Sequence, residues 1–338
     1  MKLGERSYLF KNPAHIVCGY TIVGPKEGEG NFGTEFDYVL TDDLWGEKSY
    51  ELSECKIHRE TIKGALKKAG MQDSELGLML AGDLLNEIVA SSFAAREFQS
   101  AFLGLYNACA TFGEALLIGS MLISAGFVNN CSCSTSSHFS SAERQYRYPL
   151  ELGTQRTPTS QWTVTGAGCT ILSTVAPEGR EFDVQITGGT MGRVVDMGVD
   201  DETNMGAAMA PAAADTLITH FRETGRAPSY YDAIYTGDLG KYGMKLVKYI
   251  CEDEGMTLPP NYHDCGAMYY TDKQKTEQGG SGAGCSSTAF NAHILRKLQR
   301  GELKRVLLVP TGALLSRDTP LQKQTIPGIA HAVSIEVF

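Results

Sequence analysis

Cys109 is the residue whose surroundings in the sequence best suit chemistry. It lies among small residues, Asn107-Ala108-Cys109-Ala110, and the apolar side chains after it recur with helical spacing. The pattern predicts a helix that begins at or near Cys109. Unpaired N–H groups at such a helix end lower the pKa of a thiol and attract a carboxylate or a phosphate. Cys109 is therefore a candidate nucleophile or a neighbour of a bound anion, and the alternative is an inert cysteine buried between helices.

Polar residues after a predicted strand give a second group of candidates. The strand is predicted over residues 127–135, and Ser136, Ser137 and His138 follow it. Hydroxyl groups at that end could donate hydrogen bonds to the oxygens of an acidic ligand. His138 could contact the same ligand, although a histidine without a predicted partner is more often a structural residue.

Two aspartates end corresponding predicted strands. Asp83 follows an apolar strand in the first half of the chain, and Asp238 follows another in the second half. Ligands collect at the carboxyl ends of strands in open α/β sheets. Each carboxylate could hold a Ca²⁺ ion that bridges to an acidic ligand, or could cap the next helix. We expect capping for Asp238 and leave both roles open for Asp83.

The composition excludes several classes of protein. A net charge of −9 over 338 residues, without a basic stripe, argues against a nucleic-acid partner. Nine cysteines without C-x-x-C spacing are typical of reduced thiols inside a cell, and no metal site is predicted from them. The first residues lack an apolar core and no apolar run reaches 18 residues, so we predict no signal peptide and no transmembrane segment.

The order of predicted elements repeats along the chain. Cys285 repeats Cys109 at an offset of 176 residues, and the two strand-ending aspartates are 155 residues apart. A second-half helix is predicted over 215–222 from its apolar spacing. Alternating strands and helices predict an α/β fold whose largely parallel sheets are covered on both faces. The repetition predicts two similar halves, 1–178 and 179–338.

Two motifs in this duplicated chain resemble the thiolase and ketoacyl synthase superfamily. Asn-Ala-Cys-Ala (107–110) begins a first-half helix, and Gly-Ser-Gly-Ala-Gly-Cys-Ser-Ser (280–287) precedes the matching second-half helix. The resemblance spans nearly the whole chain and implies a thiolase-like fold, a five-layer α-β-α-β-α sandwich of duplicated βα halves. It also implies an active site between the halves. Cys109 then stands at the acyl-accepting nucleophile, and His331 lies in the segment that matches a glycine-rich loop close to it.

The same resemblance argues against condensation chemistry. Gly237 stands where the enzymes carry a catalytic histidine, Ser281 stands where they carry an asparagine, and the Gly-His-Pro of thiolases is missing. Losing one oxyanion donor typically slows such a reaction about a hundredfold to a thousandfold. We therefore expect no catalytic residues and a vestigial nucleophile at Cys109. The alternatives are a Cys-dependent acyl transferase or ketoacyl-synthase-like condensing enzyme that uses Cys109, and a scaffold whose pocket has no function.

Within this superfamily the chain resembles a branch from spore-forming bacteria that is linked to the uptake of dipicolinic acid into the developing spore. The resemblance implies a non-catalytic protein that binds dipicolinic acid, with Ca²⁺ only as part of the ligand and with no other cofactor. Its expected partners are sporulation membrane proteins, which would hold it at the cytoplasmic face of the spore inner membrane. A homodimer is expected through the strand 127–135, which would otherwise be an unpaired apolar edge. The predicted ligand-binding residues are Cys109, Asp83, Asn107, Ser136, Ser137, His138 and His331.

Overall fold

The main sheet has eleven strands, and its order along the sheet differs from the order along the chain. A computed structural model describes residues 1–146 and 156–338. In it the strands run in the order β10-β9-β12-β15-β8-β1-β7-β5-β3-β4, with β2 beside β1. These strands are β1 (Ser7–Val23), β2 (Tyr38–Val39), β3 (Leu78–Gly82), β4 (Ala101–Gly104), β5 (Asn130–Ser137), β7 (Gly166–Ser173), β8 (Val184–Thr190), β9 (Ala233–Thr236), β10 (Tyr262–Asp264), β12 (Arg305–Val309) and β15 (Ala332–Val337).

One pattern of strand pairing occurs twice in this sheet. On one side of the β1–β8 contact, β1, β7 and β5 are antiparallel to one another in turn, and β3 and β4 continue in parallel. On the other side, β8, β15 and β12 are antiparallel in turn, and β9 and β10 continue in parallel. The sheet is therefore mixed, and the expectation of a largely parallel sheet is wrong. The predicted boundary at residue 178 lies between β7 and β8, and the division into halves stays a prediction.

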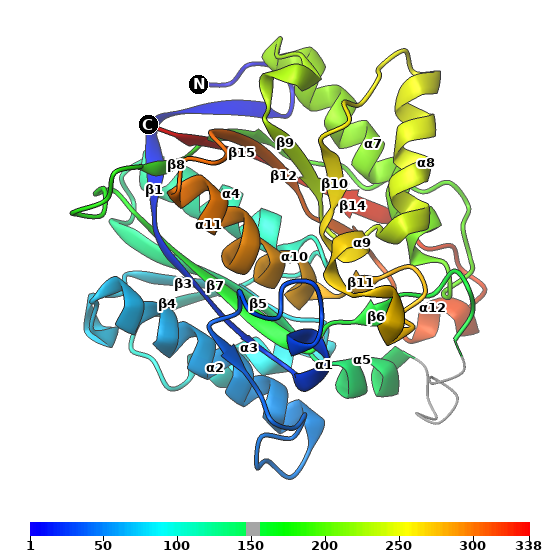
Figure 1. The fold of residues 1–338 in the computed structure, drawn as a ribbon, viewed down its shortest axis with the longest axis horizontal. Coiled ribbons are helices and arrows are strands. Elements are labelled where there is room, and N and C mark those ends of the chain that lie inside the picture. Colours follow the sequence, from blue (N-terminus) through cyan, green and yellow to red (C-terminus); the bar gives the residue numbers. More distant parts are fainter. Residues whose placement is uncertain (147–155) are drawn as a thin grey trace.

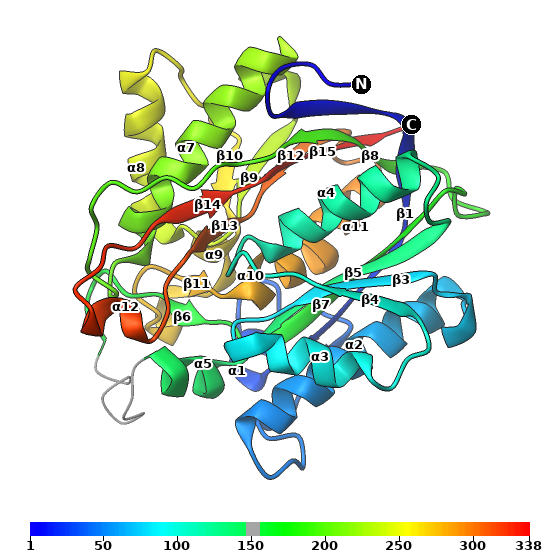
Figure 2. The ribbon, with the colours of Figure 1, turned by 180° about the vertical axis from the view of Figure 1, so that it is seen from behind.

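Helices lie on the outer faces of the sheet and also between its two parts. The helices are α1 (Pro25–Gly28), α2 (Tyr50–Ala69), α3 (Val89–Ala95), α4 (Thr111–Ser124), α5 (Phe139–Tyr146), α7 (Met205–Thr224), α8 (Gly240–Asp253), α9 (Cys265–Tyr269), α10 (Ala283–Ala289), α11 (Leu295–Gln299) and α12 (Asp318–Leu321). Figure 1 and Figure 2 show α4, α10 and α11 between the two parts of the sheet, α2 and α3 outside one part, and α7 and α8 outside the other. The five layers expected from the sequence are confirmed.

Local sequence explains where the two longest helices begin and end. Ser49 caps α2 by accepting the N–H of Leu52 at 3.2 Å, and the helix ends at Gly70, whose φ of 68° suits glycine. Asn204 caps α7 in the same way, and α7 ends at Gly225. The helix predicted over 215–222 starts ten residues earlier in the structure, at Met205. The prediction missed its alanine-rich first half because that part is buried on most sides and lacks an amphipathic pattern.

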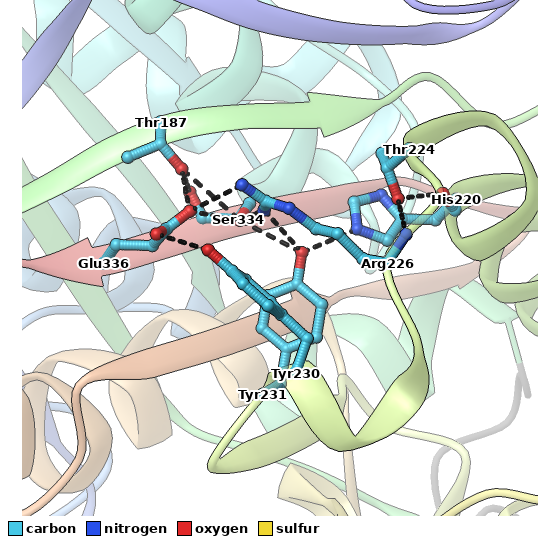
Figure 3. Close-up of polar contacts among 8 residues, drawn as sticks. All are labelled: Thr187, His220, Thr224, Arg226, Tyr230, Tyr231, Ser334 and Glu336. Carbon is cyan, nitrogen blue, oxygen red and sulfur yellow. Dashed lines mark hydrogen bonds and ion pairs between the residues drawn. The ribbon is translucent and has the colours of Figure 1, made fainter.

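A polar network fixes the end of α7 to the sheet. Arg226 donates to Ser334 Oγ at 2.8 Å, to Glu336 Oε1 at 3.0 Å and to the hydroxyl of Tyr231 at 2.9 Å (Figure 3). His220 contacts the same Tyr231 hydroxyl through Nε2 at 2.7 Å. Burial lowers the pKa of His220 to about 3, so its ring is neutral and Arg226 carries the positive charge of the network.

None of the helices within residues 1–146 and 156–338 combines the length and the apolar character needed to cross a bilayer.

Candidate functional site

Cys109 lies on a tight loop between β4 and α4. Ala108 before it has φ of 49°, a left-handed conformation that is unusual for a residue with a side chain. Thr111 holds this loop, since its hydroxyl donates to Ala108 O at 2.7 Å and accepts the N–H of Asn107 at 2.9 Å. The backbone of Gly312, in the β13 (Thr311–Ala313) hairpin with β14 (Gly328–Ala330), packs against the same loop, and a Cβ there would lie 2.3 Å from Asn107 O. The predicted position of Cys109 just before a helix is confirmed.

The side chain that faces Cys109 is Asp238, from the turn after β9. The thiol hydrogen-bonds to this carboxylate and contacts the hydroxyl of Ser281 and the N–H of Gly282. Asp238 Oδ2 accepts from Ser281 Oγ at 2.8 Å and from the N–H of Gly282 at 3.2 Å. Its Oδ1 accepts from Thr311 Oγ1 at 2.7 Å. The site therefore joins the loop before α4 to three second-half segments.

Burial and the neighbouring carboxylate decide the charge states of this pair. Both raise the pKa of the Cys109 thiol well above its ordinary value, burial being the larger cause. The prediction that the helix end lowers this pKa is therefore wrong. Burial also raises the pKa of Asp238 to about 6, although hydrogen bonds from Thr311, Cys109 and Ser281 oppose the rise. At neutral pH the pair is mainly a thiol beside a carboxylate.

Gly237 has no room for any side chain. A Cβ at this position would lie 2.8 Å from both Pro310 Cα and Thr311 N, which are backbone atoms that cannot turn aside. The residue of this turn that meets Cys109 is the next one, Asp238. The resemblance places the catalytic histidine of the enzymes at Gly237. A side chain at this position would meet the backbone of Pro310 and Thr311 and could not face the Cys109 thiol.

The two strand-ending aspartates have different roles. Asp238 does not cap α8, because the N–H groups of Leu239 and Gly240 donate to Asp264 instead, so the capping prediction for Asp238 is wrong. Asp83 accepts the N–H groups of Leu85 and Ser91, each at 2.8 Å, and thereby caps the first turn of α3. Burial raises the pKa of Asp83 as well.

A cavity that opens to the surface lies beside Cys109. Loops, helices and short strands from both halves of the chain line it, with small and apolar side chains around most of the wall and polar groups near the cysteine. The described lining residues are Leu84, Ala108, Cys109, Ala142, Glu143, Tyr146, Gln161, Thr163, Met205, Met209, Ser281, Gly282, Ala313 and Leu315. This mixture of an apolar slot and a few polar groups is typical of a site for a small molecule.

Four predicted ligand residues, Asp83 among them, have protein partners rather than a place in the described lining. Ser136 donates to Glu54 Oε1 at 3.1 Å, and Ser137 donates to Val164 O at 2.7 Å. His138 is buried, and its Nε2 contacts Asp43 O at 2.8 Å. Their role in ligand binding stays a prediction.

Asn107 and His331 lie close to the cysteine loop without lining the cavity. The side chain of Asn107 hydrogen-bonds to Glu114 in the first turn of α4. His331 is 8% exposed, and its Nδ1 accepts the N–H of Gly192 at 3.1 Å, so Nε2 carries the proton. That Nε2 has no hydrogen-bond partner among the described residues.

Two residues of this site have roles that the sequence did not predict. Asp238 was expected to cap the next helix, with a Ca²⁺ site as the alternative, and its contact with Cys109 was not predicted, although its place at the end of a second-half strand was the available signal. Gln161, just before β6 (Trp162–Thr163), gave no signal in the sequence. Its Nε2 donates to the carbonyls of Asp238 and of Gly280, the latter at 3.1 Å, and so holds the two segments that carry Asp238 and Ser281.

Comparisons with solved structures support the fold. The structure of 3-oxoacyl-[acyl-carrier-protein] synthase III from Aquifex aeolicus VF5 matches with a TM-score of 0.56 and 13% identity, over 96% of this chain and 99% of that one. The cerulenin-bound structure of Xanthomonas campestris OleA matches with a TM-score of 0.63 and 14% identity, over 97% of each chain. At these identities the likeness shows the fold alone, and it confirms the thiolase-like prediction.

Comparisons of sequence identify the family. The family model described as Stage V sporulation protein AD matches residues 4–336. The Stage V sporulation protein AD of Bacillus subtilis (strain 168) is 40% identical over 337 residues, which is 99% of this chain and 98% of that protein. The chain therefore belongs to the stage V sporulation protein AD family.

Proposed function

We propose that this protein binds dipicolinic acid in the cavity beside Cys109 and takes part in its uptake into the developing spore, without catalysing a reaction. The observation that carries the proposal is the contact between Cys109 and Asp238. Burial and that carboxylate favour the neutral thiol, whereas a nucleophilic cysteine needs the thiolate. The cavity nevertheless remains, with an apolar wall for a flat ring and polar groups at one end.

Ca²⁺ enters this proposal only as part of the ligand. The cavity lining includes the carboxylate of Glu143, which pairs with Arg156 at 3.8 Å, and the amide oxygen of Gln161, while Asp238 lies behind the wall. Ca²⁺ prefers oxygen ligands of these kinds, so the donor set is compatible with a calcium chelate. Among the described residues, no group of three or more histidine, cysteine or acidic side chains is arranged to hold a metal ion.

A second candidate function is a Cys-dependent acyl transferase or ketoacyl-synthase-like condensing enzyme. One observation favours it: the carboxylate of Asp238 is close enough to take the thiol proton from Cys109, as a general base would. The reaction would still need donors for the oxyanion of the thioester, and Gly237 cannot supply a side chain for that purpose.

The proposed partners are a second copy of the chain and other stage V sporulation A-type membrane proteins at the cytoplasmic face of the spore inner membrane. The strand predicted as the dimer edge, 127–135, corresponds to β5, which pairs with β3 and β7 and is therefore interior. The described sheet ends at β4 and at β10, and on β4, the edge nearer to β5, Leu103 is 47% exposed. We place the proposed dimer contact at β4 because an unpaired strand can add the strand of another molecule.

Calorimetry with dipicolinate tests the binding proposal. Titration of the protein in the presence and absence of Ca²⁺ should release or absorb heat with one site per chain. Benzene-1,3-dicarboxylate has the same two carboxylates without the ring nitrogen and serves as the matched control ligand. Absence of binding in both conditions, with a correctly folded protein, would refute the proposal.

A further inference from the structure

Asp238 holds donors that would otherwise be available at the Cys109 end of the cavity. Its carboxylate accepts from Ser281 Oγ at 2.8 Å, from the N–H of Gly282 at 3.2 Å and from the thiol of Cys109. All three of these donors line the cavity, whereas Asp238 lies behind them and is 1% exposed. The charged carboxylate therefore keeps the hydroxyl hydrogen of Ser281 turned away from any bound ligand.

No cation balances this carboxylate within residues 1–146 and 156–338. No ion pair joins Asp238 to a lysine, arginine or histidine of that part of the chain. The other titratable groups that act on it or feel its charge are Cys109, Asp264, Cys265 and Cys285. The three thiols have raised pKa values and stay neutral, and Asp264 adds negative charge.

A ligand that carries carboxylates would bring more negative charge to this place. Two carboxylates that share a poorly solvated site favour uptake of a proton by one of them. The protonated Asp238 could then donate to Ser281 Oγ, because a hydroxyl can accept one hydrogen bond and donate another. The hydrogen of Ser281 would become free to point into the cavity.

We infer that Asp238 and Ser281 form a proton-linked relay: binding of a carboxylate ligand protonates Asp238, reverses the Asp238–Ser281 hydrogen bond and turns the Ser281 hydroxyl into a donor to the ligand. The inference rests on the proposed function only in that the cavity must bind a carboxylate such as dipicolinate. Up to one proton is taken from solvent for each ligand bound, and no other group is transferred. Asp238 is a positioning residue here, since it acts on the ligand through Ser281.

Substitutions of the two residues should separate the relay from a structural role. The Asp238→Asn side chain has two possible orientations. In one, its oxygen faces Ser281 and Gly282 and its NH₂ group faces Thr311, whose hydroxyl can turn to accept. In the other, its NH₂ group donates permanently to Ser281. In either orientation no proton is needed, so ligand affinity should become independent of pH. Ser281→Ala removes the donor and should weaken binding about tenfold at pH 6. Asp272→Asn removes a carboxylate that is 93% exposed and should change nothing.

The test is calorimetry with dipicolinate at pH 7 in two buffers of different ionisation enthalpy, together with affinities at pH 6 and pH 8. The wild type should take up a substantial fraction of one proton and bind about tenfold more tightly at pH 6, and Asp238→Asn should lose both effects. Wild-type binding without proton uptake would overturn the relay and leave the proposed function standing. Absence of binding by the wild type at every pH would overturn both. Circular dichroism of each variant verifies its fold, and wild-type binding without proton uptake would overturn the relay even if a variant does not fold.

Discussion

Cys109 and Asp238 meet across the middle of the molecule, the thiol from the loop before α4 and the carboxylate from the turn after β9. The two side chains are 129 positions apart in the sequence. Their contact places a group that opposes thiolate formation at the position where a thiolate would be needed for acyl transfer. The proposed non-catalytic function rests on this contact.

The Cys109 thiol should react slowly with iodoacetamide at pH 7 to 8, because its pKa is well above the ordinary value. Asp238→Asn removes the neighbouring negative charge and should speed alkylation at pH 8 by roughly tenfold, which corresponds to about one pKa unit. Peptide mass spectrometry after timed labelling measures the rate at this one cysteine. An equal rate in both proteins would mean that Asp238 has no influence on the thiol.

Cys109 should contribute space rather than chemistry to the cavity. Cys109→Ser should leave most dipicolinate affinity intact, whereas Cys109→Leu should weaken it at least tenfold by filling space beside Ser281. Incubation with acyl-CoA and malonyl or acetyl thioesters should give no condensation product. Intact-mass analysis of the protein and a product assay check this. A stable acyl adduct on Cys109 with several turnovers would restore the condensing enzyme.

Glu27 should make the protein less stable as the pH rises. Burial raises its pKa to about 7 from 4.5, so the folded state holds the proton more tightly than the unfolded state does. The corresponding stability is complete below pH 4.5 and is lost between about pH 4.5 and 7, up to about 3 kcal/mol. Glu27→Gln keeps the acceptor for Tyr270 and Thr165 and should raise stability at pH 8 but not at pH 4.

Urea unfolding at pH 4, 6 and 8 measures this effect. Glu178→Gln, which changes an exposed carboxyl, is the matched control and should follow the wild-type profile. A Glu27→Gln protein that parallels the wild type at all three pH values would contradict the prediction.

Arg226 should stabilise the fold through the network of Figure 3. Arg226→Met leaves Glu336 and the hydroxyls of Tyr231 and Ser334 without their shared donor, and the side chains of Arg226 and Glu336 are only 17% and 12% exposed. We expect a loss of about 2 kcal/mol in the free energy of unfolding. Adding Glu336→Gln should cost less than the sum of the single changes. Arg300→Met, at an exposed ion pair, should have no measurable effect.

Leu103 should decide whether two chains associate. Leu103→Lys places a charge on the free edge strand β4 and should give monomers if the proposed dimer uses that edge. Leu321→Lys changes a leucine on α12 that is 77% exposed and should leave the association state unchanged. Sedimentation velocity at micromolar concentration distinguishes the states. A wild type that is monomeric there would refute the dimer.

Periodicity predicted the elements that carry a clear amphipathic pattern, and it failed where the pattern is uniform. The predicted helix after Cys109 corresponds to α4, and the helix predicted over 215–222 lies within α7. The first ten residues of α7 were missed because they are mostly alanine and include Pro211. β5 was taken for an edge because its partner β7 had not been assigned, and a strand's pattern does not state which strand covers it.

The site was less predictable than the fold because its contacts join distant segments. Cys109 could be selected from local sequence, since a cysteine among small residues before a helix is visible there. Its pKa depends on Asp238 and on burial, and neither follows from spacing along the chain. Gln161 acts through a side chain that bridges two carbonyls, a role for which local sequence has no signature.

Strand β1 has a consequence for the order of events during protein synthesis. Its second half pairs with β7, and its first half pairs with β8, for example Ala14 with Ile186. At about 5–20 residues per second, a ribosome needs roughly 10–30 s to make the residues between them. During that time the start of the nascent chain exposes an unpaired strand that other chains could capture. Refolding of the full-length chain also has to bring β1 and β8 together across this distance in sequence, so we expect it to be slower than folding through local contacts would be.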